Sequence, residues 1–136
     1  MEAQVAQFSF EGYRIASASI NIDPSFDKPG ALNIGFNVKG LDNSKMKTFL
    51  LSIVTEINDE EGKVSCEIKL DGRFKYEGID DPKVKKSLFE TNGPAILFPY
   101  LRAYITALTS LSGIPAITLP TINFAKSISV EINTQS

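Results

Sequence analysis

Histidine is absent from this sequence of 136 residues, and cysteine occurs once, at Cys66. Without histidine the chain cannot hold a Ser-His-Asp or Cys-His catalytic arrangement, or a metal site with histidine ligands. A single cysteine cannot form a disulfide within the chain, which fits a reducing cytoplasm. Cys66 stands in an alternating apolar segment, where nothing in the sequence lowers the pKa of its thiol. We therefore interpret it as a buried structural residue rather than a nucleophile.

Motifs of enzymes and of nucleic-acid-binding proteins are also missing. The chain has no glycine-rich phosphate loop, no nucleophile elbow and no spacing typical of metal ligands. Its net charge of -2 argues against nucleic acid as a partner, because such a partner requires a basic patch. The sequence predicts a binding protein that is not an enzyme and needs no cofactor.

Signals for membrane insertion or secretion are not found. Residues 1–12 lack the basic and apolar parts of a signal peptide. The charge-free run after Arg102 is long, but Gly113, Pro115 and Pro120 interrupt it. We expect a cytoplasmic protein with one domain, residues 1–136, because this length is typical of a single domain.

The most apolar stretch is residues 91–126, where Arg102 is the one charge between Glu90 and Lys126. Asn92-Gly93-Pro94 predicts the start of a helix and Ser112-Gly113 its end. Apolar residues cover roughly 200° of this helix, whereas packing on one core needs about 100° or slightly more. Small polar residues form one narrow stripe between them. The stripe consists of Arg102, Thr106, Thr109 and Ser110.

The surplus apolar surface predicts that this helix packs on its own sheet on one side and on another subunit on the other. Small side chains at Ala103 and Ala107 allow a second helix to approach closely. The predicted oligomer interface consists of Tyr100, Ala103, Tyr104, Ala107, Leu108 and Leu111.

The segment that follows, Ile114 to Phe124, is equally apolar but contains Pro115 and Pro120. Proline lacks the amide donor, so this segment is neither a helix nor a central strand. We expect an extended apolar loop that lies on the protein or lines a groove, because solvated apolar surface is unfavourable.

Upstream of the helix, alternating apolar residues predict four strands, at residues 6–22, 32–40, 46–57 and 63–76, with a bulge at Gly12. Short connections between them imply an antiparallel meander. The predicted fold class is α+β, with a four-stranded antiparallel sheet covered on one face by the long helix and the apolar loop.

A short helix is predicted after the fourth strand. Asp81 is placed as its N-cap and Pro82 as its first residue. We expect Val84 and Leu88 to point inward and three lysines to form a solvated face. These lysines are Lys83, Lys85 and Lys86.

The long helix and the loop resemble those of the SecB protein-export chaperones. Ile96-Leu97-Phe98-Pro99-Tyr100 followed by Arg102 is similar to the helix pattern of that family. The loop pattern is similar at Pro115, Leu119, Pro120, Asn123 and Phe124. A weaker similarity lies upstream, in Cys66-Glu67-Ile68, Gly72, Phe74 and Gly78-Ile79.

The resemblance implies an ATP-independent holdase that binds unfolded preproteins in apolar grooves. It also implies a homotetramer built as a dimer of dimers, with helices packed between the dimers. The client-binding residues would be Phe8, Phe10, Phe36, Ile114, Ile117, Leu119, Ile122 and Phe124. For each of them, ordinary core packing is the alternative interpretation.

Several features depart from the family pattern. Acidic residues of the family engage the SecA ATPase, and Asp23 and Glu67 match such positions, but Ser19 stands where an acid is usual. Residues 127–136 alternate, which predicts an extended tail where the family usually has a helix. These departures argue against delivery of clients to SecA. Two alternatives remain open: a chaperone specialised for one client such as an antitoxin, and an oligomeric protein that binds a small ligand.

Overall fold

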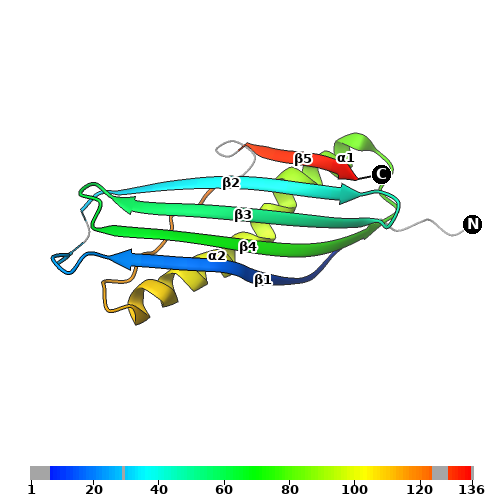
Figure 1. Ribbon diagram of the computed structural model, residues 1–136. Coiled ribbons are helices and arrows are strands. Elements are labelled where there is room, and N and C mark those ends of the chain that lie inside the picture. The colour runs from blue at the N-terminus through cyan, green and yellow to red at the C-terminus, as the bar shows by residue number, and fades with distance from the viewer. Residues whose placement is uncertain (1–6, 29, 124–128, 136) are drawn as a thin grey trace, which may run out of the picture.

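The computed structural model describes residues 7–28, 30–123 and 129–135. A β-sheet forms one layer, and helix α2 lies across one of its faces (Figure 1). This arrangement confirms the predicted α+β class, with an antiparallel sheet and a long helix over one face. Strands β2, β3 and β4 form a meander as predicted, but β1 pairs with β4 and not with β2, so the first connection crosses to the other side of the sheet. In chain order the elements are β1 (Gln7–Ile22), β2 (Leu32–Asn43), β3 (Thr48–Asp59), β4 (Val64–Glu77), α1 (Pro82–Ser87), η1 (Leu88–Asn92), α2 (Gly93–Leu111) and β5 (Val130–Gln135).

The sheet has one strand more than the four predicted, and its order is β1-β4-β3-β2-β5. Strand β5 pairs in parallel with β2, from Val38 opposite Val130 to Asn43 opposite Gln135. The extended conformation predicted for the tail is thus found at residues 130–135. It becomes a strand because its alternating residues pack on the hydrophobic core at the edge of β2.

Strand β1 contains the predicted bulge. Its register against β4 shifts between Phe10 and Gly12, and again between Ile15 and Ser17. Gly12 has a φ of 130°, which a residue with a side chain rarely adopts. The first shift leaves Phe10 opposite Phe74 and brings Tyr13 opposite Gly72.

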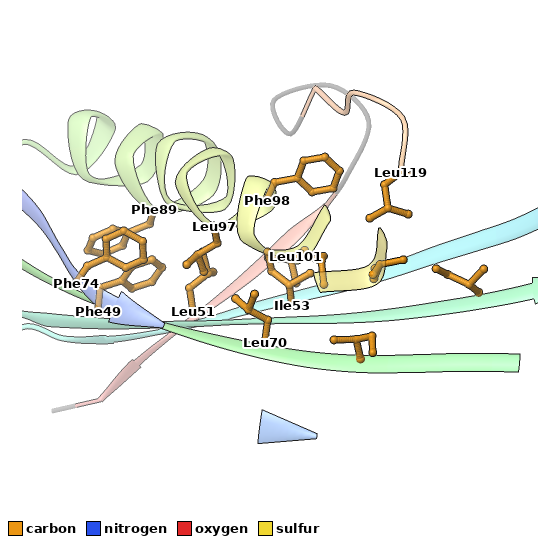
Figure 2. Packing of buried hydrophobic residues seen from close by; sticks show 14 of the residues in the cluster. Phe49, Leu51, Ile53, Leu70, Phe74, Phe89, Leu97, Phe98, Leu101 and Leu119 are labelled. Carbon is orange, nitrogen blue, oxygen red and sulfur yellow. The ribbon is translucent and has the colours of Figure 1, made fainter. Parts of the chain in front are cut away.

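The hydrophobic core lies between the sheet and α2. Alternate residues of β3 and β4, among them Leu51, Ile53 and Leu70, face the buried side of the helix (Figure 2). The helix comes close because Gly72 has no side chain: a Cβ there would lie 2.5 Å from the methyl carbons of Leu97. At one end of the core the rings of Phe49 and Phe89 stack with their centroids 3.9 Å apart.

Helix α1 begins as predicted but turns a different face inward. The Asp81 carboxylate accepts a hydrogen bond from the Lys83 amide at 2.9 Å, and Pro82 is the first helical residue. The prediction for Val84 is wrong, because 46% of its surface is exposed. Lys85, predicted to be solvated, points inward and lies 2.8 Å from the Asp42 carboxylate.

The physical reason for this difference is the buried carboxylate of Asp42 on β2. Its side chain is only 6% exposed, and a buried charge requires compensating partners. Tyr76 Oη donates a hydrogen bond to Asp42 Oδ1 at 2.6 Å, and Lys85 Nζ contacts Oδ2. The three residues connect β2, β4 and α1.

We expect Lys85→Met to lower the free energy of unfolding by about 1–3 kcal/mol, because it leaves the Asp42 carboxylate without its cation. The matched control is Lys86→Met on the same helix, whose side chain is 75% exposed and which should change stability by less than about 0.5 kcal/mol. Urea unfolding measures both values. Equal effects of the two changes would contradict the structural role of Lys85.

The same three residues predict a loss of stability at alkaline pH. Burial acts to lower the pKa of Lys85, but its hydrogen bonds and the charge of Asp42 outweigh burial and raise the pKa. Burial, followed by the hydrogen bond to Asp42, raises the pKa of Tyr76. The folded state therefore holds these protons more tightly than the unfolded state. Their contribution to the free energy of unfolding should be complete below about pH 10 and should decline as the pH rises further. Urea unfolding at increasing pH should show a steeper decline in the wild type than in Lys85→Met.

Candidate functional site

The loop that follows α2 is attached to the helix by polar side chains. The Ile117 amide donates to Thr109 Oγ1 at 2.9 Å, and Thr106 Oγ1 donates to the Ile117 carbonyl at 3.1 Å. Farther along, Arg102 Nη2 donates to Thr121 Oγ1 at 3.4 Å. We call this line of contacts the seam. It runs along the polar stripe noted in the sequence, except that Ser110 is exposed.

Thr109 is the central residue of the seam. It is fully buried, and its hydroxyl donates to the Ile105 carbonyl at 2.8 Å while accepting the bond from the Ile117 amide. A buried amide without a partner is strongly unfavourable, so this hydroxyl allows the loop to pack on the core. Sequence reasoning missed its role. The signal was present, as a polar stripe on a helix that is otherwise apolar.

The seam decides which loop residues face the core. Ile117 and Leu119, predicted to contact a client, are only 4% and 2% exposed. They belong to the hydrophobic core, because the hydrogen bonds of Ile117 hold the loop with these two side chains toward the sheet. Ile114 and Ile122 are half-buried and remain accessible. Phe124 lies outside the described residues.

We call Phe36 of β2, Phe98 of α2 and Ile122 of the loop the loop-side band. The Phe36 ring meets the Phe98 ring edge-on, with centroids 6.1 Å apart. The Arg102 guanidinium lies 5.2 Å from the centroid of Phe98 and bonds Thr121, the neighbour of Ile122. Phe36 and Ile122 are half-buried, whereas Phe98 is buried.

Phe8 and Phe10 lie in a second, β1-side band, which also contains Tyr13 and Tyr100. Phe8 stacks on Phe74 with centroids 4.8 Å apart, and Phe10 lies 5.6 Å from Tyr100. Tyr13 and Tyr100 stack at 4.4 Å and are 43% and 39% exposed. The predicted aromatic client residues are therefore divided between β1 and β2 and do not form one continuous wall.

The predicted interface residues of α2 are accessible in the protomer. Ala103 and Ala107 are exposed, and Leu111 is 87% exposed. Tyr104 and Leu108 are half-buried. The helix thus presents small and apolar side chains on the side that faces away from the sheet.

The two acidic residues considered for SecA lie in different environments. Asp23 follows β1, where the hydroxyl and amide of Ser25 donate to its carboxylate at 2.6 and 2.8 Å and lower its pKa. Glu67 is exposed on β4, with Ser19 opposite on β1 and Glu56 opposite on β3. Neither residue is part of the loop-side or β1-side band.

Signs of catalysis or metal binding are not seen in the part of the chain that the structure describes. Cys66 and the acidic residues of that part form no group of three or more that could hold a metal ion. Burial raises the pKa of the Cys66 thiol, which disfavours the nucleophilic thiolate. Among the described helices, none has the length and hydropathy needed to cross a membrane.

Comparison with known proteins agrees with this architecture. The family model described as preprotein translocase subunit SecB matches residues 4–134. A protein-export protein SecB of Anaplasma phagocytophilum is 31% identical over 112 residues, covering 71% of this chain and 70% of the relative. That of Pseudomonas fluorescens is 28% identical over 130 residues, covering 90% of this chain and 81% of the relative.

A solved structure shows the same fold. It is a SecB-like chaperone of Mycobacterium tuberculosis in complex with a peptide from the HigA1 antitoxin. Its TM-score is 0.72 at 18% identity, and the match covers 85% of this chain and 90% of that one. Fold and sequence together define the class, a molecular chaperone of protein export. The chain belongs to the SecB family, which is not a family of enzymes.

We expect Thr109→Val to lower the free energy of unfolding by about 1–3 kcal/mol, because it keeps the shape of the side chain but leaves the buried Ile117 amide without an acceptor. Hydrogen exchange at that amide should accelerate. Thr106→Val is the matched control: it removes a part-buried bond to the Ile117 carbonyl and should leave exchange at the amide slow. Unchanged exchange in Thr109→Val would contradict the seam.

Proposed function

We propose that the chain acts as an ATP-independent holdase, which binds unfolded polypeptide on the half-buried apolar residues beside α2. The observation that carries the proposal is the loop-side band, where accessible apolar side chains of two separate elements, β2 and the loop, accompany the buried Phe98 ring of α2. Ordinary core packing explains Ile117 and Leu119, but it leaves Phe36 and Ile122 partly uncovered. The proposed client contacts are Phe8, Phe10, Phe36, Ile114 and Ile122.

The energetics of such surfaces suit transient capture. Each half-buried side chain has only its exposed part left to bury when a client binds. Burial of apolar surface contributes about 25 cal/mol per Å² to the free energy of binding. Single contacts are therefore weak and release the client readily. Binding to the unfolded state alone still shifts the folding equilibrium of the client by mass action. Several bands on one assembly strengthen binding through effective concentration.

Assembly into a homotetramer is part of the proposal. The outward side of α2 supplies small residues at Ala103 and Ala107 beside the exposed Leu111. The outer edge of β1 has no strand partner among the described residues, and such an edge readily pairs with another chain. Both surfaces favour association of identical protomers.

The proposed partners are unfolded preproteins in the cytoplasm, before export. The face of the sheet that carries Glu67 also carries basic residues, since Lys39 and Lys69 are exposed in the same alternation. This mixed charge differs from an acidic surface suited to SecA. We therefore propose that the chain captures clients, and we do not propose that it delivers them to SecA. A chaperone dedicated to a single client, such as an antitoxin, is the second candidate.

The first test compares two pairs of loop substitutions in a refolding assay. The wild type, at stoichiometric amounts, should delay the refolding of an unrelated denatured protein. Ile114→Ser with Ile122→Ser should weaken this effect severalfold while costing less than about 1 kcal/mol of stability per site. Ile117→Ser with Leu119→Ser should instead destabilise the protomer by several kcal/mol, about 2–5 for each buried side chain lost.

The outcomes separate the candidate functions. If the wild type neither delays refolding nor suppresses aggregation, a general holdase is wrong. Protection of one partner alone would favour the specialised chaperone, and a small molecule retained in native mass spectrometry would favour a ligand-binding protein. Client affinity unchanged in Ile114→Ser with Ile122→Ser would contradict the proposed contacts.

The second test concerns assembly. Ala103→Glu with Ala107→Glu should split the oligomer, because an unpaired charge buried where helices meet costs several kcal/mol. The serine pair at the same positions is the control and should remain assembled. Light scattering at micromolar concentration gives the mass of each variant. A monomeric wild type would contradict the proposed tetramer.

A further inference from the structure

The edge of β2 covered by β5 has the properties of a binding site for an extended polypeptide. Strand β5 has six residues, and only Val130 and Ile132 are half-buried. It pairs with a single strand, and that pairing is parallel, which is slightly less stable per residue than antiparallel pairing. The covering strand is therefore held by few interactions.

Ile132 fills a socket on the core side of β2. A Cβ at Gly40 would lie 2.6 Å from both Ile132 Cδ1 and the Phe49 ring. The side chain of Ile132 thus occupies space that exists because residue 40 has none. Beside it a hollow of about 510 Å³ is lined by Ile132, Phe89 and Lys85, among others, which leaves room for a side chain longer than isoleucine.

The socket is continuous with the loop-side band. Phe36 precedes Val38, the first partner of β5, by two residues and is on the same face of β2. Among the described residues, no strand pairs with residues 32–37 on this side of β2. The edge of β2 to which β5 is paired therefore leads toward Phe36.

We propose that β5 occupies, within its own chain, a strand-addition site on β2, and that an extended client segment with a bulky aliphatic residue in the Ile132 socket displaces it. The inference rests on the proposed holdase function and states where a client backbone pairs. Backbone hydrogen bonds give affinity without regard to sequence, and the socket selects one side chain.

A disulfide that locks β5 in place tests the displacement. Lys39 and Glu131 are partners across β2 and β5, both exposed, at the spacing of adjacent strands that a disulfide can bridge. Oxidised Lys39→Cys with Glu131→Cys should bind a reduced, carboxymethylated polypeptide about tenfold more weakly than its reduced form, because the binding-competent fraction falls. Cys66 is buried and does not compete.

The matched control joins the same residue of β2 to its other neighbour. Lys39 is also the partner of Ser52 on β3, so oxidised Lys39→Cys with Ser52→Cys should bind as its reduced form does. A second variant acts in the opposite direction. Ile132→Ser weakens the covering strand and should tighten binding severalfold, whereas Asn133→Ser, exposed on the same strand, should not.

The outcomes distinguish this inference from the proposed function. Equal binding of the unfolded polypeptide by the oxidised and reduced forms of Lys39→Cys with Glu131→Cys overturns strand displacement and leaves the proposed holdase function standing. A disulfide that joins two chains, and not two residues of one chain, assigns the site to β5 of a second copy. That result also overturns the inference. If neither the wild type nor reduced Lys39→Cys with Glu131→Cys binds the unfolded polypeptide, the proposed holdase function is wrong. The client site on β2 is then wrong too.

Discussion

The constraint on which the rest of the structure depends is that an apolar segment broken by prolines must bury its side chains without burying unpaired amides. The Thr109 hydroxyl meets this constraint, since it accepts from the Ile117 amide at 2.9 Å in the interior. With that bond made, Ile117 and Leu119 complete the core. The same geometry turns Ile114 and Ile122 toward the surface. A buried hydrogen bond therefore determines which part of the loop belongs to the core and which part stays accessible.

This division explains how one apolar helix can serve two purposes. The sheet side of α2 is committed to the core through Leu97, Leu101 and Ile105, and the polar stripe is committed to the loop. The remaining side carries small residues and exposed tyrosine and leucine, which suit contact with another protomer. Because the seam lies between the two apolar sides, the proposed assembly surface and the proposed client contacts can be altered separately.

Much of the fold follows from the sequence, because local rules control it. Alternating apolar residues predicted strands β1 to β4, and Gly12 predicted the bulge in β1. Asp81 predicted the start of α1 and Gly113 the end of α2. The surplus apolar surface of α2 was also predictable, since it needs only the helical period. The segments concerned are long and strongly periodic, and their geometry depends little on distant residues.

The site was less predictable, because it depends on contacts between distant elements. Lys85 turns inward only because Asp42, on another strand, is buried. The loop residues divide between core and surface according to a hydroxyl on the helix. The aromatic residues divide between two bands because β1 and β2 lie on opposite sides of β3 and β4. Apart from the polar stripe on α2, none of these pairings has a signature within one segment.

The pairing of β5 adds a consequence for the choice of client. A tethered strand competes at an effective concentration on the order of millimolar, so a short free peptide displaces it poorly at ordinary concentrations. A long unfolded chain that has already bound Phe36 and Ile122 presents its next segment to β2 at a similar effective concentration. The two strands then compete on nearly equal terms, and the fit of one side chain into the socket at Gly40 decides the result. A covering strand held by few interactions would thus favour long unfolded chains over short peptides as the partners that displace it.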